Sequence, residues 1–373
     1  MRIKDLHIQH FRNIASAQVA FMAGVNVIYG WNAQGKTNLL EAVYLLVTGK
    51  SFRTNNDAEM IPWTVADYNG SVIRADIEKA AGDEQIVYFF NGRQRRISIN
   101  HKPIERLAHL IGRLNAVLFT PTDLLLVRGS PTLRRRFLDI AISQVNPGYL
   151  NALQTYQLVL KNRNQLLKQI NGREGSATQL DVYDEQLSQA GALIMDIRTN
   201  SLAEISRNAA LHYAAIANSP EALDLQYLPD VASPDLQVPS VQTLAAALRA
   251  SRAEDMRRLS TNRGPHRDDF QFTVQQHAAR NFASQGQQRT AVLAIKLAEM
   301  DFLHSHTGEW PLLMLDDLMS ELDENRRNAL LSYLKPQVQT FITTTDYHTV
   351  TRHAPVQQLI QVTGGTVTTK SAD

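Results

Sequence analysis

The chain has 373 residues, of which 44% are hydrophobic, and its 38 Lys and Arg nearly balance 36 Asp and Glu, giving a net charge of +2. This length allows two or three lobes around a sizeable core. The absence of cysteine excludes disulfides and thiolate metal sites, and it favours a cytoplasmic protein. No apolar run approaches the roughly 20 residues needed to cross a bilayer, and the first residues have no signal-peptide core.

The first part of the chain, up to about residue 121, is expected to be rich in strands. Alternating apolar and polar residues over 2–11 and 17–22 predict two strands, and the continuous apolar run 25–29 predicts a buried one. A helix is expected over 36–48. Within 84–104 two alternating runs meet at Asn91-Gly92, which predicts a hairpin.

The middle of the chain, about 122–260, has helical character. Spacings of three and four residues predict helices over 149–170 and 181–217, joined by a turn, whereas four prolines make 218–240 a loop region. Further on, a helix over 284–303, a strand at 310–317, a helix at about 323–334 and a strand at 340–345 follow, with a polar tail at 363–373. Strand–helix–strand at this spacing predicts a parallel sheet, and hence an α/β fold.

A phosphate-binding loop is the most specific motif. Residues 30–37 read G-x-x-x-x-G-K-T, between an apolar strand and a helix-forming run. Its glycines let backbone N–H groups point at phosphate oxygens, Lys36 would reach the terminal phosphates, and Thr37 offers a hydroxyl to Mg²⁺. The nucleotide-binding residues predicted here are Gly30, Trp31, Asn32, Ala33, Gln34, Gly35, Lys36 and Thr37.

Two adjacent carboxylates end the apolar run of 312–315. Asp316 is expected to hold Mg²⁺ together with Thr37, and Asp317 to orient the attacking water, which makes Asp316, Asp317 and Lys36 the predicted catalytic residues. The alternative is that the two acids cap the next helix. Because magnesium needs a carboxylate, the presence of the phosphate loop favours the metal role.

The stretch "SQGQQ" starts the predicted helix at 284. Ser284 and Gln287 have the spacing of a capping box, in which each side chain satisfies the other's backbone N–H. Gly286 is unfavourable in a first helical turn, which suggests that something approaches the backbone closely. The stretch is therefore either only a cap or also a binding surface.

The order of these motifs resembles that of ABC-type ATPases. In those proteins a signature motif, here similar to "ASQGQQ", precedes the Walker B strand, and a D-loop, here "SELD" (Ser320–Asp323), and a switch strand, here "TTTD", follow it. The resemblance implies a mixed sheet in an ATPase head with a mainly helical second lobe: 1–121 and 290–373 as lobe I, and 122–289 as lobe II with the signature. It also implies that Ser284, Gly286 and Gln287 contact ATP held by a second copy.

Several stretches together resemble the RecF family, which is related to SMC proteins. They are "IQHFRNI", "TPTDLLLVRGSPTLRRRFLD" (120–139), "TNRGPHRDDF" (261–270), "SQGQQRT" and "LMLDDLMSELD". This resemblance implies a weak, DNA-stimulated ATPase of recombinational repair and replication restart that dimerises head-to-tail on DNA with ATP. It implies partnership with RecR and RecO in directing RecA to gaps, support of the SOS response, and nucleotide-framing roles for Arg12 and Asn13.

Two departures from the ABC pattern suggest that ATP works as a switch. Asp317 stands where most members have glutamate, and a shorter acid suggests slow hydrolysis. Thr345 occupies the position of the usual switch histidine. No glutamine-loop is obvious, although Thr122 and Asp123 lie in the corresponding region.

Contacts to DNA are expected from clustered arginines. The favoured cluster is Arg93, Arg95 and Arg96 at the hairpin tip, although any such cluster is more commonly a solvated face. Other clusters occur at 134–136, 249–252, 257–258 and 263–267. The lack of an aromatic stacking strip favours backbone contacts to a duplex or junction.

Three rival functions are weaker. A transporter subunit would not need the long helical insertion, and a P-loop nuclease would need a second carboxylate cluster. An SMC-like chromosome-structuring head would need long coiled coils, whereas the helical stretch before the break at 171–178 is about 22 residues, or roughly 33 Å.

Overall fold

The computed structural model describes residues 1–62, 70–172, 174–217, 221–232, 238–319, 322–332, 334 and 336–371. The chain divides into two compact units. The first comprises Met1–Asp123, Ala215–Asn218 and Lys296–Asp373, and the second comprises Leu124–Ala214 and Ser219–Ile295.

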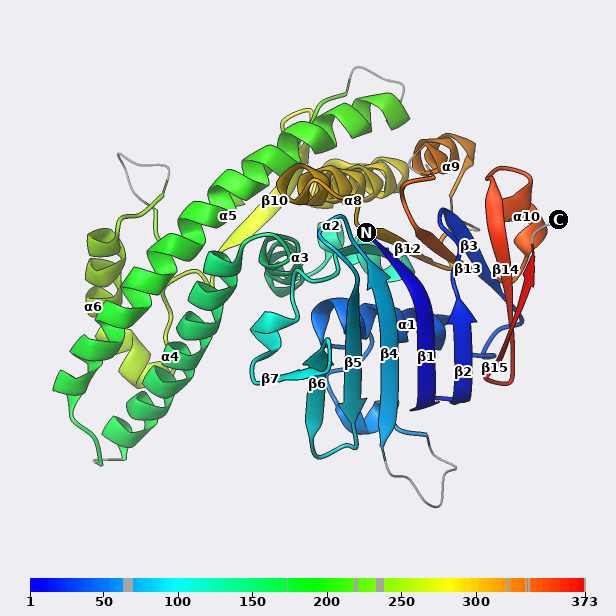
Figure 1. Ribbon diagram of the computed structural model, residues 1–373. Coiled ribbons are helices and arrows are strands. Elements are labelled where there is room, and N and C mark those ends of the chain that lie inside the picture. Colours follow the sequence, from blue (N-terminus) through cyan, green and yellow to red (C-terminus); the bar gives the residue numbers. More distant parts are fainter. Residues whose placement is uncertain are drawn as a thin grey trace. The chain divides into compact units, whose positions relative to one another are not determined.

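An antiparallel sheet forms one layer of the first unit (Figure 1). Among the described residues it has six strands in the order β2-β1-β4-β5-β6-β7. The strands are β1 (Arg2–Phe11), β2 (Ile14–Ala20), β4 (Ser71–Glu78), β5 (Glu84–Phe90), β6 (Arg95–Ile99) and β7 (Lys102–Ile104). The predicted hairpin is confirmed as β5–β6, but the chain then adds β7 as a third strand, which the sequence did not predict.

The second layer of this unit is a mixed sheet. Its described order is β15-β14-β3-β13-β12-β8, and the pairs from β14 to β8 are all parallel. The strands are β3 (Val25–Tyr29), β8 (Ala116–Phe119), β12 (Leu312–Asp316), β13 (Thr340–Thr344), β14 (Val356–Thr363) and β15 (Thr366–Ser371). The predicted parallel strand–helix–strand unit is confirmed by β12, α9 (Glu324–Leu331) and β13. The expected polar tail is instead the edge strand β15, antiparallel to β14.

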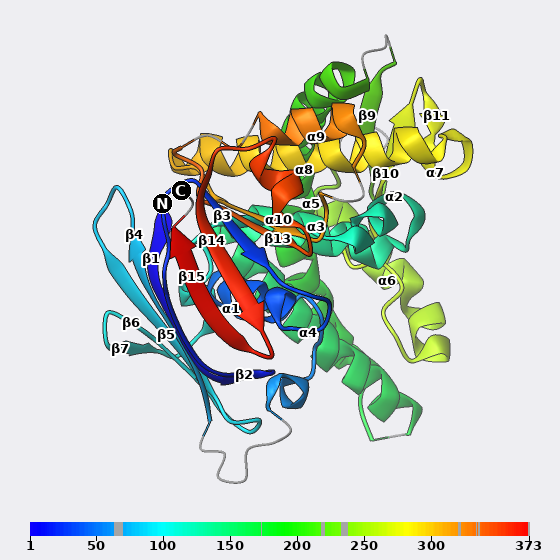
Figure 2. The same ribbon diagram turned by 90° about the vertical axis from the view of Figure 1, so that its right-hand side faces the viewer.

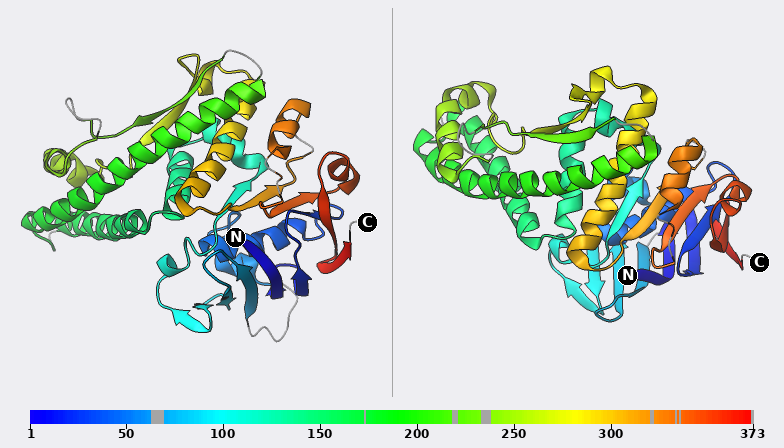
Figure 3. Two further views of the ribbon diagram at one scale, coloured as in Figure 1. Left: turned by 45° about the horizontal axis from the view of Figure 1, so that its top comes forward. Right: turned by 90° about the horizontal axis from the view of Figure 1, so that it is seen from above.

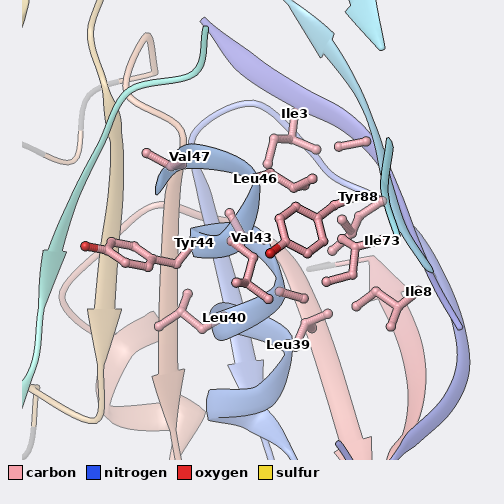
Figure 4. Packing of buried hydrophobic residues seen from close by; sticks show 14 of the residues in the cluster. Ile3, Ile8, Leu39, Leu40, Val43, Tyr44, Leu46, Val47, Ile73 and Tyr88 are labelled. Atoms are coloured by element: carbon pink, nitrogen blue, oxygen red, sulfur yellow. The ribbon is translucent and has the colours of Figure 1, made fainter. Parts of the chain in front are cut away.

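Helix α1 (Lys36–Thr48) lies between the two sheets (Figure 2). Apolar residues recur along nearly its whole length, so it can be buried on more than one side. Figure 4 shows Leu46 close to Ile3 of β1 and Val43 close to Tyr88 of β5. The same cluster continues into the mixed sheet, which fixes the start of α1 relative to the ends of the parallel strands.

The second unit is mainly helical (Figure 3). Its longest helices are α4 (Pro147–Asn171, 25 residues), slightly longer than the stretch expected over 149–170, and α5 (Leu180–Ala217, 38 residues), which confirms the helix expected over 181–217. Arg163 of α4 pairs with Asp184 of α5 and with Asp255 of α6 (Val241–Arg258), both at 2.8 Å. A buried ion cluster thus joins three helices.

The region 218–240, predicted to be a loop, contains a strand. Residues 218–220 and 233–237 lie outside the described residues, but between them β9 (Leu223–Leu228) pairs with β10 (Asp269–Val274), which also pairs with β11 (His277–Ala278). Leu223 and Leu225 are buried, so the alternation of a strand was present but obscured by the surrounding prolines.

The remaining described elements are short except for α8. They are α2 (Leu125–Arg128), α3 (Pro131–Ser143), α7 (Ala279–Phe282), α8 (Gln285–Thr307), α10 (Tyr347–Thr351) and the 3₁₀ turns Asp57–Met60, Leu107–His109, Pro121–Leu124 and Ala177–Gln179. In the described part of the chain, no helix has the length and apolar character that a membrane span requires.

Candidate functional site

The glycine-rich loop joins β3 to α1, as its sequence predicts. Gly30 and Gly35 both have positive φ, 157° and 113°, and neither has room for a side chain. A Cβ on Gly30 would lie 2.2 Å from the carbonyl oxygen of Val362, and one on Gly35 would lie 2.6 Å from Oδ1 of Asn13. Gly35 caps α1 without a side-chain hydrogen bond, which leaves the first N–H groups of the helix available to an anion.

Lys36 folds back over this loop. Its Nζ donates to the carbonyl oxygens of Gly30 at 2.8 Å and Trp31 at 3.0 Å. Burial lowers the pKa of Lys36, and the carboxylates of Asp317 and Asp316 oppose that shift. The ammonium group therefore lies against the backbone of the loop, where the charges of both acids act on it.

The back of the loop is held by side chains and by the β14–β15 turn. Asn13 donates to the carbonyl oxygen of Gln34 at 2.9 Å and accepts from Asn38 at 2.7 Å. Gly364 and Gly365 donate to the side chain and the backbone of Gln34. Asn32 and Ala33 complete the loop, Ala33 with a φ of 63°. Asn13 thus supports the loop itself.

Arg12 lies in the turn between β1 and β2 and forms an ion pair with a buried acid. Its guanidinium forms two hydrogen bonds to the fully buried carboxylate of Glu41 in α1, at 2.9 and 2.6 Å, and a third to the carbonyl oxygen of Glu59. The described contacts of Arg12 therefore connect the β1–β2 turn to α1.

Thr37 and the two acids meet at the ends of neighbouring strands. The Thr37 hydroxyl donates to Oδ1 of Asp316 at 2.9 Å, and the Thr343 hydroxyl donates to the same oxygen at 2.8 Å. Burial raises the pKa of Asp316, and these two hydrogen bonds oppose the rise. The Asp317 N–H donates to the Thr343 hydroxyl at 2.9 Å, while Asp317 has a φ of 50°.

Thr343 was missed by the sequence analysis, which singled out Thr345. Thr345 follows β13 and is exposed, whereas Thr343 is fully buried inside the strand. The register that pairs Asp316 with Thr343 brings the two together. The signal available in the sequence was a threonine near the end of the strand that follows Walker B. The pairing register of the two strands, which places this threonine beside Asp316, could not be read from the sequence.

The "SQGQQ" stretch forms the predicted capping box. The Ser284 N–H donates to Oε1 of Gln287 at 2.7 Å, and the Gln287 N–H donates to the Ser284 hydroxyl at 3.2 Å. The Gln287 amide also donates to Glu221 at 2.9 Å, while Ser284 is exposed and Gly286 half-buried. These residues belong to the second unit. Of the "SELD" stretch that follows Walker B, Ser320 and Glu321 lie outside the described residues.

The arginines considered for DNA are not equivalent. Arg93, Arg95 and Arg96 are all exposed, but Arg95 forms a two-pronged ion pair with Asp57. Within the described part of the chain, the Arg96 side chain has one hydrogen bond, to Gln94 at 3.3 Å. In the second unit, Arg134 is buried and paired with Asp269 at 2.7 Å, a structural role. Arg93 and Arg96 therefore offer the more available charges at the hairpin.

Comparison with known proteins identifies the family. The model described as "RecF/RecN/SMC N terminal domain" matches residues 2–369. The DNA replication and repair protein RecF of Enterococcus faecalis is 41% identical over 349 residues, covering 92% of both chains. That of Exiguobacterium sp. is 38% identical over 375 residues, covering 100% of both. The chain belongs to the RecF family.

Solved structures agree with this assignment. A structure of the recombination mediator protein RecF with ATP, in the RecFOR pathway, matches with a TM-score of 0.91 and 33% identity over 99% of this chain and 97% of that one. The Smc head of Pyrococcus furiosus matches with a TM-score of 0.56 at 14% identity, a likeness of fold alone. The predicted fold, an SMC-related ABC-type ATPase head, is confirmed for this RecF-family chain.

Proposed function

We propose that this chain is an ATP-dependent DNA-binding protein of recombinational repair and replication restart, in which ATP drives head-to-tail dimerisation on DNA and slow hydrolysis releases it. The observation that carries the proposal is the meeting of the phosphate loop with Asp316: the hydroxyl of Thr37 is 2.9 Å from the carboxylate. The match to a RecF structure with ATP supports the choice of nucleotide.

The loop residues fit the triphosphate of ATP. The unobstructed start of α1 and the left-handed loop backbone offer N–H groups to phosphate oxygens. The Nζ of Lys36 would give up its hydrogen bonds to the carbonyl oxygens of Gly30 and Trp31 and bind the terminal phosphates instead. Asn13 would act by supporting this loop, and Arg12 by anchoring the β1–β2 turn to α1.

Thr37 and Asp316 also fit Mg²⁺. A hydroxyl and a carboxylate already in contact are the hard oxygen ligands that this ion takes beside a nucleotide. When bound, Mg²⁺ would supply charge neutralisation of the phosphate oxygens. Asp317 follows directly and would orient the attacking water. Its short side chain supports slow turnover, so that the weak, DNA-stimulated ATPase acts as a timer on the dimer.

The signature residues would complete the site of a second copy. Ser284 is exposed at the first turn of α8, and its capping role leaves the surface of that turn available. The terminal phosphate held by the phosphate loop of the partner would then be contacted by Ser284, Gly286 and Gln287. In this proposal, residues 122–289, which include these three, form lobe II.

DNA and the other proteins of the pathway are the proposed partners. Relatives are called DNA replication and repair proteins, and one solved relative belongs to the RecFOR pathway, which supports RecR and RecO as partners in directing RecA to gaps. Support of the SOS response and action in the cytoplasm belong to the same proposal. The exposed Arg93 and Arg96 are the proposed duplex contacts.

The test is sedimentation of wild type and Lys36→Ala with and without ATP and duplex DNA. Wild type should shift from monomer to dimer with ATP, while Lys36→Ala should lose both ATP binding and the shift. Lys50→Ala, just beyond α1, is the control for removal of a lysine. A wild-type chain that stays monomeric with ATP and DNA contradicts the proposed switch, and a Lys36→Ala variant that dimerises normally contradicts the site.

A further inference from the structure

We propose that Thr343 is a positioning residue of the ATPase site, whose single hydroxyl fixes both acids: the carboxylate of Asp316 by donation and the backbone of Asp317 by acceptance. This inference rests on the proposed function, because the two acids are assigned their roles there. Nothing in the motif pattern marks Thr343, which lies two residues before the expected switch position.

The contacts of the hydroxyl use both its hydrogen and its lone pairs. Oγ1 of Thr343 lies 2.8 Å from Oδ1 of Asp316 and 2.9 Å from the amide nitrogen of Asp317. An N–H can only donate, so the Asp317 bond requires the hydroxyl oxygen as acceptor, and the hydroxyl hydrogen remains for the carboxylate. The carbonyl oxygen of Leu315 lies farther away, at 3.5 Å.

The bond between Thr343 and Asp316 is buried, whereas the bond from the Asp317 N–H is partly buried, because Asp317 itself is exposed. Thr343 is 0% exposed and Asp316 is 8% exposed. Water cannot readily replace a lost partner at Thr343, and a buried polar group without a partner is costly. The hydroxyl therefore holds Asp316 in one orientation, with Thr37 fixing the same oxygen from α1 at 2.9 Å.

Asp317 depends on the second bond in another way. Its φ of 50° lies in the left-handed region, which is unfavourable for most residues other than glycine, although aspartate adopts it more readily than most. The N–H bond to Thr343 stabilises this conformation at the point where the chain leaves β12. Since the backbone sets the direction of the Cα–Cβ bond, Thr343 fixes the point from which the Asp317 side chain leaves the backbone.

Thr340 provides a matched control in the same strand. It is also 0% exposed, but its hydroxyl bonds only to the carbonyl oxygen of Val338, at 3.3 Å, among the contacts described. Substituting either threonine by valine removes one buried hydroxyl from β13 and keeps a β-branched side chain of similar size.

The first measurement is hydrogen exchange of the nucleotide-free protein over residues 312–319. Thr343→Val should speed exchange at the Asp317 amide by about tenfold, because the acceptor is lost, whereas Thr343→Ser should not. Thr340→Val should leave this amide as in wild type. Unchanged exchange in Thr343→Val overturns the proposed hold on Asp317. Should valine prevent folding, Thr343→Ala removes the same hydroxyl without a bulkier group.

The second measurement is binding of a fluorescent ATP analogue against Mg²⁺ concentration, together with kcat and KM. In Thr343→Val the Mg²⁺ midpoint should rise and kcat fall by about 10- to 100-fold, with binding in EDTA unchanged. Thr343→Ser should restore both. The inference is overturned if Thr343→Val shows neither effect, or if Thr343→Ser is as impaired as Thr343→Val. A wild-type chain that binds no nucleotide instead refutes the proposed function, while the exchange result still stands.

Discussion

The hydroxyl of Thr37 donates to Oδ1 of Asp316 at 2.9 Å and so joins two residues 279 positions apart in the chain. This contact brings the first turn of α1 to the end of β12. Both groups can ligate a metal ion through oxygen, and the carboxylate of Asp316 is largely buried. Holding the two groups in one arrangement lowers the cost of ordering ligands around a divalent ion.

Removing either side of this pair should weaken the Mg²⁺ dependence of nucleotide binding. We expect Thr37→Val and Asp316→Asn each to reduce Mg²⁺-ATP affinity by about 10- to 100-fold, measured by calorimetry with Mg²⁺ and again with EDTA. The EDTA affinity should change little. Thr48→Val, at the other end of α1, is the control. Wild-type affinity for Mg²⁺-ATP in Asp316→Asn would remove Asp316 from the metal site.

Local signals in the sequence were enough for the loop, α1 and the flanking strands. The apolar run 25–29, the glycine motif and the helical residues after it each specify structure within a few residues, and β3 and α1 begin and end where predicted. The capping box of Ser284 and Gln287 is local in the same sense. Such features depend on backbone preference and neighbouring hydrogen bonds.

The missing parts of the prediction depend on residues distant in the chain. The sequence does not reveal that Glu41 lies beside Arg12 or that Asp57 lies beside Arg95, so it could not show that both arginines form ion pairs within the fold. Thr343 became visible only through the register of β12 and β13. Tertiary pairing, not local preference, decides which charges are free.

Ser284→Arg should separate the cap from the proposed second-copy contact. A long cation at this exposed helix start should leave ATP binding intact and abolish ATP-dependent dimerisation in sedimentation. The matched control is Ser240→Arg, which removes a similar cap from α6, where Ser240 accepts from the Thr243 N–H at 3.1 Å. Each lost cap should cost about 1 kcal/mol of stability. If Ser284→Arg dimerises like the control, the stretch is only a cap.

Substitutions at the β5–β6 hairpin should distinguish arginines that contact DNA from the arginine that stabilises the fold. Arg93→Glu with Arg96→Glu should weaken duplex binding and reduce the slope of log affinity against log salt by up to about 2, since two phosphate contacts are lost. Arg95→Ala should mainly lower stability, because it leaves Asp57 without its ion pair. Fluorescence anisotropy across a salt series measures the slopes.

The control for this experiment is the double reversal of Arg257 and Arg258, which both pair with Glu254. It changes the net charge by the same amount on the second unit. If the slope of log affinity against log salt is reduced in this variant but unchanged in the hairpin variant, the DNA-binding surface is on α6 and not on the hairpin.

His266, in the "TNRGPHRDDF" stretch, should make the stability of the protein fall in mild acid. Its Nδ1 lies 2.7 Å from the Tyr156 hydroxyl and its Nε2 lies 3.0 Å from the carbonyl oxygen of Thr261, an arrangement that a neutral imidazole satisfies with one N–H. Burial lowers the pKa of His266 to about 4 from its ordinary value of 6.5, and the nearby Arg267 and Arg135 act in the same direction.

Between these two pKa values the unfolded chain binds more protons at this histidine than the folded chain does. The free energy of unfolding therefore decreases as the pH falls from 6.5 towards 4, and the full contribution is present above 6.5. Urea unfolding at pH 7 and pH 5 should show a smaller pH-dependent loss for His266→Gln than for wild type. His277→Gln, at an exposed position, should keep the wild-type difference. An unchanged pH dependence in His266→Gln would mean that His266 is protonated as readily in the fold as in the unfolded chain.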